Sequence, residues 1–175
     1  IWIQPSSGDA GGSLGSALFA WYQYQGNNRK TDGIKDSMQG SYLGPSFGND
    51  YIARYLEKNS ISYKQLSDEE IPERIADLIA EQKVIGWFEG RMEFGPRALG
   101  ARSIIGDARS PQMQEIMNLK TKFRESFRPF APSVLRERVS DYFEIDKESP
   151  YMFVVAPART EIGRDTSDDE QRSFG

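Results

Sequence analysis

The chain has 175 residues and a net charge of −4, with 38% hydrophobic and 27% charged residues, a composition expected of a soluble globular protein with one domain or two small ones. It contains no cysteine and no histidine, which excludes disulfides, thiolate chemistry, a Ser-His-Asp triad and a His-ligated metal within this chain. The acidic balance disfavours a generic binder of nucleic acid or anionic membranes, and no apolar run approaches the roughly 18 residues of a membrane span.

The first part of the chain predicts helices separated by a long polar connection. In chain order, the patterns predict a strand at 1–4, a Gly- and Ser-rich turn at 6–12, a helix at 13–24, a loop at 27–48, a helix capped by Asn49 and a small strand at 61–63. Ser67 and Glu70 have the spacing of a capping box, which predicts a further helix start there.

The second part predicts strands that alternate with helices. In chain order, we expect strands at 84–88 and 102–105, a helix capped by Ser110, a strand at 130–135, a helix at 136–143 and a strand at 151–156. The polar, acidic segment from 159 onward is expected to be frayed. Alternation of this kind predicts an α/β or α+β architecture.

Basic residues are concentrated in one block of this acidic chain. Residues 91–138 contain ten basic and five acidic residues, a net charge of +5, whereas the remaining 12 basic and 21 acidic residues give −9. Most of the ten are arginines, whose planar fork matches phosphate and carboxylate oxygens. The block predicts a site for a small anionic ligand, with a solvated basic face as the alternative.

Three segments carry residue types suited to binding an anion. Residues 6–15 are a Gly-rich turn before a helix, in which Asp9 could cap the helix, bind a ribose hydroxyl or ligate a metal. Residues 87–103 place three arginines and three glycines after a buried strand. Residues 120–133 place four basic side chains before two prolines that fix an extended backbone. The last two segments together predict one phosphate site, against the alternative of ordinary charged turns.

Two of these segments also resemble a known family. Residues 86–104 (GWFEGRMEFGPRALGARSI) and 122–133 (KFRESFRPFAPS) closely resemble the signature of the NodU/CmcH-type O-carbamoyltransferases, and the likeness extends from Gln4-Pro5 to Pro157. The resemblance implies that residues 1–26 are a strand-loop-helix remnant of an actin/sugar-kinase-like (Kae-like) transferase domain. It further implies that 27–82 are a linker with helices, and that 83–175 are a YrdC-like domain, a twisted sheet with helices, which we expect to be incomplete.

The resemblance implies an activity and roles for particular residues. The YrdC-like domain would form carbamoyl adenylate from carbamoyl phosphate and ATP with Mg²⁺, and the upstream domain would pass the carbamoyl group to a hydroxyl of a sugar, nodulation factor or antibiotic-type acceptor. Lys122, Arg124 and Arg97 would be catalytic, and Asp9 would be a weak metal ligand without His partners. The residues expected to bind substrate or phosphate are Arg91, Glu93, Arg102, Ser103, Lys120, Arg128 and Ser133.

The expected setting follows from the same resemblance. Iron is expected in the full-length transferase domain and not in this chain. We expect a cytoplasmic enzyme that binds neither a membrane nor a nucleic acid. A homo-oligomer is possible. This chain alone is not expected to carbamoylate an acceptor. Two alternatives remain: a free-standing YrdC-like threonylcarbamoyl-adenylate synthase for tRNA modification, and a non-catalytic phosphate or nucleic-acid binding module.

Overall fold

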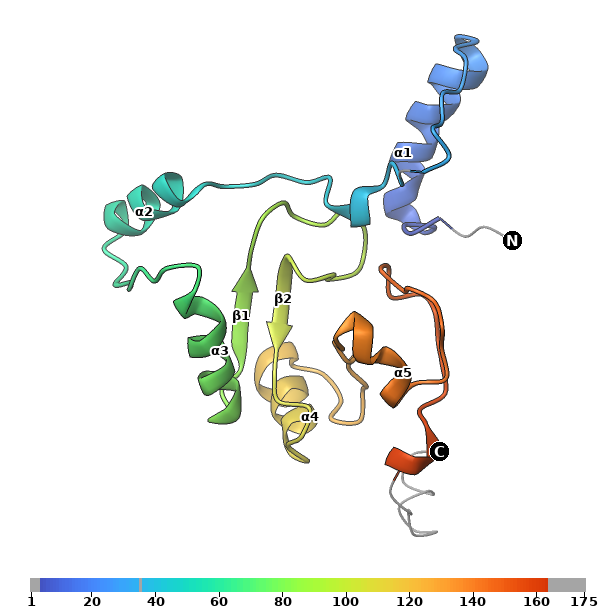
Figure 1. Ribbon diagram of the computed structural model, residues 1–175. Coiled ribbons are helices and arrows are strands. Elements are labelled where there is room, and N and C mark those ends of the chain that lie inside the picture. The colour runs from blue at the N-terminus through green and yellow to red at the C-terminus, as the bar shows by residue number, and fades with distance from the viewer. Residues whose placement is uncertain (1–3, 35, 164–175) are drawn as a thin grey trace. The chain divides into compact units, whose positions relative to one another are not determined.

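The structure is a computed structural model that describes residues 4–34 and 36–163. The chain forms two compact units, one made of Ile1–Arg74 with Gly86–Ile104 and the other of Ile75–Ile85 with Ile105–Gly175. The elements are a mixture of helices and a small sheet, which confirms the α/β class at this level (Figure 1). Among the described residues, no helix has the length and apolar character needed to cross a membrane.

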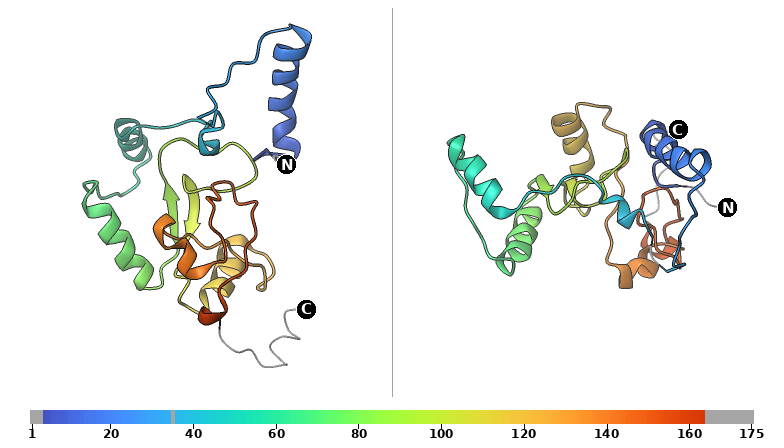
Figure 2. Two further views of the ribbon diagram at one scale, coloured as in Figure 1. Left: turned by 45° about the vertical axis from the view of Figure 1, so that its right-hand side comes forward. Right: turned by 90° about the horizontal axis from the view of Figure 1, so that it is seen from above.

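The first helix is longer than the sequence predicts. Helix α1 (Asp9–Phe19) continues into a π-helical turn at Ala20–Tyr24, so that the two form one rod in Figure 2. The predicted helix at 13–24 is therefore confirmed, but it begins four residues earlier, inside the predicted turn. Gly11 permits this start, because a Cβ on Gly11 would lie 1.8 Å from the Ser6 carbonyl oxygen. The strand predicted at 1–4 lies outside the described residues except for Gln4, which is not in a strand.

The next two helices lie close to their predicted positions. Helix α2 (Asn49–Lys58) begins at Asn49, although Gly48 occupies the cap position and no side chain caps the helix. Helix α3 (Glu70–Ala80) has the predicted capping box: the backbone N–H of Ser67 donates to Glu70 Oε2 (2.8 Å), and the backbone N–H of Glu70 donates to Ser67 Oγ (3.3 Å). A 3₁₀ turn at Gln39–Ser41 lies in the predicted loop.

The sheet consists of the two strands that the sequence predicts most strongly. Strand β1 (Ile85–Phe88) pairs with β2 (Arg102–Ile105), and their arrows run in opposite directions in Figure 1. The connection between them, residues 89–101, is the segment rich in arginine and glycine. The pairing therefore brings both ends of this segment together.

The second unit contains short helices and long irregular segments. Helix α4 (Met113–Ile116) continues into a π-helical turn at Met117–Lys122, and a 3₁₀ turn at Arg136–Arg138 precedes α5 (Val139–Tyr142), which confirms the helix predicted at 136–143. A last 3₁₀ turn spans Thr160–Ile162. Ser110 is not the cap of α4, because Gln112 holds that position and Ser110 Oγ donates to Gln82 Oε1 (2.6 Å).

Three predicted strands are wrong, each for a local reason. Residues 61–63 follow Ser60, whose φ is +54°, and Tyr63 donates its hydroxyl hydrogen to Glu57 instead of pairing in a sheet. Residues 130–135 are irregular, and Pro129 and Pro132 remove backbone donors that a ladder needs. Residues 151–156 include Met152 with φ +53°, and in the described part of the chain they form no strand, although an isolated bridge joins Phe143 and Ala158 nearby.

Buried polar groups outnumber buried apolar ones in the described part of the chain. Its buried apolar side chains are Ala101, Met113, Met117 and Tyr151, and its buried polar ones are Ser6, Ser41, Glu93, Asp107, Ser110 and Asn118. Hydrogen bonds satisfy the side chains of five of these polar residues, and Ser41 Oγ is the exception, without a partner among the described residues. Hydrogen bonds, more than apolar packing, therefore determine the path of the loops that carry the candidate site.

Candidate functional site

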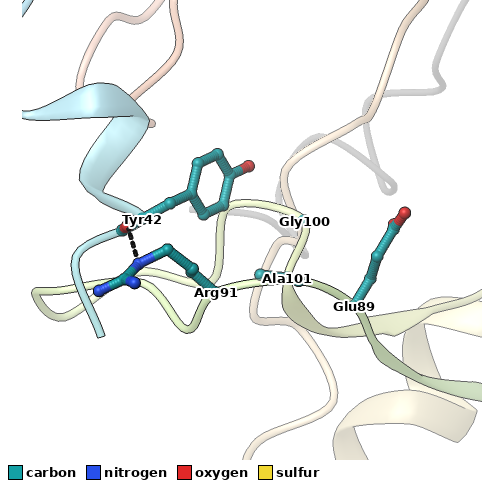
Figure 3. Close-up of a pocket in the computed structure, with 6 residues that line it drawn as sticks. Tyr42, Glu89, Arg91, Gly100 and Ala101 are labelled. Atoms are coloured by element: carbon teal, nitrogen blue, oxygen red, sulfur yellow. Dashed lines mark hydrogen bonds between the residues drawn. The ribbon is translucent and has the colours of Figure 1, made fainter. Parts of the chain in front are cut away.

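An open pocket of about 370 Å³ lies against the connection between β1 and β2 in the first unit. Its lining residues are Tyr42, Glu89, Gly90, Arg91, Gly100 and Ala101 (Figure 3). The Tyr42 ring lies beside the connection, and its hydroxyl donates to the Leu99 carbonyl oxygen (2.5 Å). Burial, followed by the charges of Glu93 and Glu89, raises the pKa of Tyr42, so this phenol stays protonated at neutral pH.

A buried carboxylate organises the same connection from within. Glu93 is 8% exposed, and its Oε1 accepts hydrogen bonds from the backbone N–H groups of Leu99 (2.8 Å), Ala101 (2.7 Å) and Arg102 (3.1 Å). Three converging backbone donors form the kind of concavity that binds an anion. In this protein the anion is the Glu93 carboxylate itself. The structure thus shows Glu93 bound to the loop and occupying these three donors.

The pKa of Glu93 reflects this environment. Burial raises it, but the hydrogen bonds from Leu99, from its own backbone N–H, and from Ala101 and Arg102 lower it further, so the net shift is below the ordinary value. Glu93 is therefore ionised in the folded protein well into the acidic range. A carboxylate that is charged at neutral pH suits a fixed structural anchor better than a proton donor.

Arg91 and Arg97 in the connection and Arg102 at the start of β2 have different surroundings. Arg91 donates to the carbonyl oxygens of Tyr42 (3.0 Å) and Leu43 (3.1 Å), and Arg102 donates to those of Glu89 (2.9 Å), Gly90 (3.2 Å) and Ala101 (2.8 Å). The Arg102 guanidinium also lies 3.5 Å from the centre of the Phe88 ring.

Arg97 and Ser103 complete the residues predicted on this connection. Arg97 is exposed, and within the described ranges its side chain has no hydrogen bond or ion pair, so its guanidinium is available to a ligand. Ser103 Oγ accepts the backbone N–H of Gly100 (3.1 Å). Gly95, two residues before Arg97, has φ +117°, and a Cβ there would lie 2.4 Å from Ser6 Oγ, so the chain needs glycine at this position.

The second unit contains the other basic segment, folded around a buried amide. Asn118 is 0% exposed, and its Nδ2 donates to the carbonyl oxygens of Ser126 (2.9 Å) and Arg128 (2.8 Å). Its Oδ1 accepts a hydrogen bond from Arg124 Nε (2.6 Å). The Arg124 guanidinium also lies 4.9 Å from the centre of the Phe130 ring, an arrangement that stabilises a cation. Asn118 therefore binds the Nε atom of the Arg124 guanidinium, and the Phe130 ring lies against one face of the same group.

The other predicted residues of this segment are exposed. Arg128 Nε pairs with Glu125 Oε2 at 2.9 Å, a surface contact between residues three apart. Lys120, Lys122 and Ser133 are exposed, and no hydrogen bond or ion pair of their side chains is found among the described residues. Two free ammonium groups and one fixed guanidinium make this segment suited to an oxyanion.

Asp9 lies exposed in the first turn of α1. The described residues contain no group of three or more His, Cys, Asp or Glu side chains arranged to hold a metal ion. A single carboxylate does not supply the donor set that a protein-bound iron requires. The donors present around Asp9 therefore do not fit iron, and no step of the chemistry below depends on that metal.

The sequence reasoning missed Asn118, Gln114 and Tyr42. Gln114 Nε2 donates to the carbonyl oxygens of Phe127 (3.1 Å) and Arg128 (3.2 Å), so two amides one helical turn apart hold the same loop. An amide pair at i and i+4, directly before a proline-containing segment, was the available signal. Tyr42 had no comparable signal, because it lies far from the connection in sequence.

The chain is similar in sequence to a protein family and to several known proteins. Residues 76–169 match the family described as "Carbamoyltransferase C-terminus". An uncharacterized protein of Synechocystis sp. is 54% identical over 177 residues, covering 100% of this chain and 29% of that protein. The nodulation protein NolNO of Sinorhizobium fredii is 39% identical (91% of this chain, 23% of that protein), and the nodulation protein NolO of Bradyrhizobium diazoefficiens is 40% identical (93% and 30%).

The chain belongs to the carbamoyltransferase C-terminus family, as the matched range covers more than half of it. The resemblance to NodU-type carbamoyltransferases is thereby confirmed. The chain spans less than a third of the length of the relatives named above. Both basic segments, at 91–103 and 120–133, lie inside the matched range.

Proposed function

We propose that this chain is the part of an O-carbamoyltransferase that binds carbamoyl phosphate and ATP and forms carbamoyl adenylate. The observation that carries the proposal is the segment at 120–128, where Arg124 is fixed beside the exposed cations Lys120 and Lys122. We propose a carbamoyl substrate because the chain belongs to a carbamoyltransferase family. The cations can bind several phosphate oxygens at once. The carbamoyl group would then pass to a hydroxyl of a small-molecule acceptor on another part of the longer protein.

The proposed reaction does not need a histidine. Water releases phosphate from carbamoyl phosphate and leaves carbamate. A carbamate oxygen then attacks the α-phosphorus of ATP, the bond from that phosphorus to the bridging oxygen breaks, and pyrophosphate leaves. The charge that develops lies on phosphoryl oxygens, where Lys122 and Arg124 can stabilise it together with the Mg²⁺ that accompanies ATP. Arg97, exposed on the connection between β1 and β2, is proposed as a further catalytic residue. Arg128 and Ser133 are proposed to contact the remaining oxygens.

The domain assignment belongs to the same proposal. We assign 83–175 to a YrdC-like domain, 27–82 to a linker with helices, and 1–26 to the end of a Kae-like transferase domain. The support is the sequence resemblance at 86–104 and 122–133. Arg91, Glu93, Arg102 and Ser103 are proposed to bind substrate or phosphate at the connection between β1 and β2, whose path their hydrogen bonds fix.

Titration calorimetry tests the binding part of the proposal. We expect the protein to bind both carbamoyl phosphate and MgATP, and the affinity to fall as salt rises from about 50 to 300 mM, because exposed cations are screened by salt. Adenosine, which has no phosphate, should bind far more weakly. Absence of binding by a folded sample, or equal binding of adenosine and ATP at every salt concentration, contradicts the proposal.

A further inference from the structure

We propose that Asn118 is a positioning residue that aims Arg124 at a phosphoryl group of the ligand, an assignment that rests on the proposed function of this segment. Asn118 lies in the π-helical turn that follows α4, and it is fully buried although its neighbours Leu119 and Lys120 are exposed. A buried amide is costly unless all its groups are bonded. Asn118 meets this condition through hydrogen bonds from its side chain to Arg124, Ser126 and Arg128, in the loop that carries basic residues.

Asn118 forms three side-chain hydrogen bonds and accepts one hydrogen bond at its main-chain carbonyl oxygen, and these bonds have different roles. The Nδ2 group binds the carbonyl oxygens of Ser126 and Arg128, which closes the loop back onto the helix. The backbone N–H of Arg124 donates to the Asn118 carbonyl oxygen (3.0 Å), so both the main chain and the side chain of Arg124 are tied to this one residue. The Oδ1 atom binds Arg124 Nε. Loop closure and arginine orientation thus depend on one amide.

The orientation of Arg124 determines what it can bind. Its guanidinium offers Nε, Nη1 and Nη2, and among the described residues only Nε has a hydrogen-bond acceptor. With Nε occupied and Phe130 against one face, the Nη1–Nη2 edge is left to donate two parallel hydrogen bonds. That edge matches two oxygens of one phosphoryl group. Lysine at 124 could not be held in this way, because it has no secondary nitrogen.

Gln114 provides a matched control. It holds the same loop, through the carbonyl oxygens of Phe127 and Arg128, but has no hydrogen bond to Arg124. A residue that only stabilises the loop should behave like Gln114. A residue that positions Arg124 should be energetically coupled to Arg124 in ligand binding.

The test is a double-mutant cycle on MgATP and carbamoyl phosphate affinity, measured by calorimetry. We expect Asn118→Leu to weaken binding about tenfold, Gln114→Leu less than about twofold, and Asn118→Leu to have no further effect in an Arg124→Lys background, as for residues in one hydrogen-bonded network. Independent effects of Asn118→Leu and Arg124→Lys overturn the inference while leaving the proposed function intact. Failure of the unmodified protein to bind either ligand overturns the proposed function itself.

A spectroscopic measurement keeps the inference falsifiable if Asn118→Leu does not fold. In the unmodified protein, Arg124 Nε–H should give a slowly exchanging ¹H–¹⁵N signal, assigned by its loss in Arg124→Lys. The signal should remain, and the Nη signals should appear or shift, when MgATP is added. A rapidly exchanging Arg124 Nε–H in the free protein, or loss of the Nε signal on adding MgATP, contradicts the assigned role of Asn118.

Discussion

Replacing Glu93 with alanine is expected to lower the free energy of unfolding by about 3 kcal/mol, because three backbone donors lose a charged acceptor inside the protein. Denaturant unfolding followed by fluorescence measures this change. Glu115→Ala is the matched control, since Glu115 is exposed in α4 and has no side-chain partner among the described residues, and we expect a change within about 0.5 kcal/mol. Equal losses in the two variants would show that the Glu93 contacts do not stabilise the fold.

The same carboxylate predicts a pH dependence. The pKa of Glu93 is lower in the folded protein than in the unfolded chain, so its contribution to stability is fully present above the ordinary carboxyl range. That contribution is lost progressively as the pH falls from the ordinary value of about 4.5 through the lower pKa of the folded protein. Glu93→Gln should therefore be less stable at neutral pH and lose less stability on acidification. A parallel loss in both proteins would contradict the assigned pKa shift.

Replacing Arg124 with lysine is expected to weaken the binding of MgATP and carbamoyl phosphate by about 1–3 kcal/mol, or roughly 5- to 150-fold. Lysine keeps the charge but cannot bind Asn118 through a secondary nitrogen or offer a planar fork. Calorimetry on samples whose thermal unfolding has been checked measures the change.

Arg136→Lys is the control for this substitution. Arg136 is 83% exposed and pairs with Glu148 at the surface, a contact that contributes little. We expect its binding constants to stay within about twofold of the unmodified protein. Similar losses in the two variants would mean that ligands respond to the net charge of the block and not to Arg124.

Local patterns predicted the elements whose stability is local. The capping box of Ser67 and Glu70 formed as expected, because it depends on residues three positions apart. The strand at 102–105 was predicted to the residue, and it pairs with β1, the other strand that the sequence predicts strongly. The strands predicted at 130–135 and 151–156 failed because an apolar run does not specify a partner strand. Prolines and a left-handed Met152 made pairing there unfavourable.

The candidate site was predictable in composition but not in geometry. The excess of arginine and lysine at 91–138 identified the two basic segments before any fold was known. The role of Glu93 could not be predicted, because its three donors lie six to nine residues away along a path that depends on Gly95 and Gly100. Asn118 was missed for a related reason. A polar residue next to an apolar stripe of a helix is normally predicted to be exposed, and Asn118 is buried because the loop at 124–128 folds over it.

The most direct test of the proposed function is ATP–pyrophosphate exchange by the protein. With labelled pyrophosphate, MgATP and carbamoyl phosphate, we predict that label enters ATP, because carbamoyl adenylate forms and reverts. Bicarbonate with threonine in place of carbamoyl phosphate should give no exchange. Exchange that requires bicarbonate and threonine, or no exchange by folded protein that binds both MgATP and carbamoyl phosphate, would contradict the assignment of carbamoyl adenylate formation to this chain.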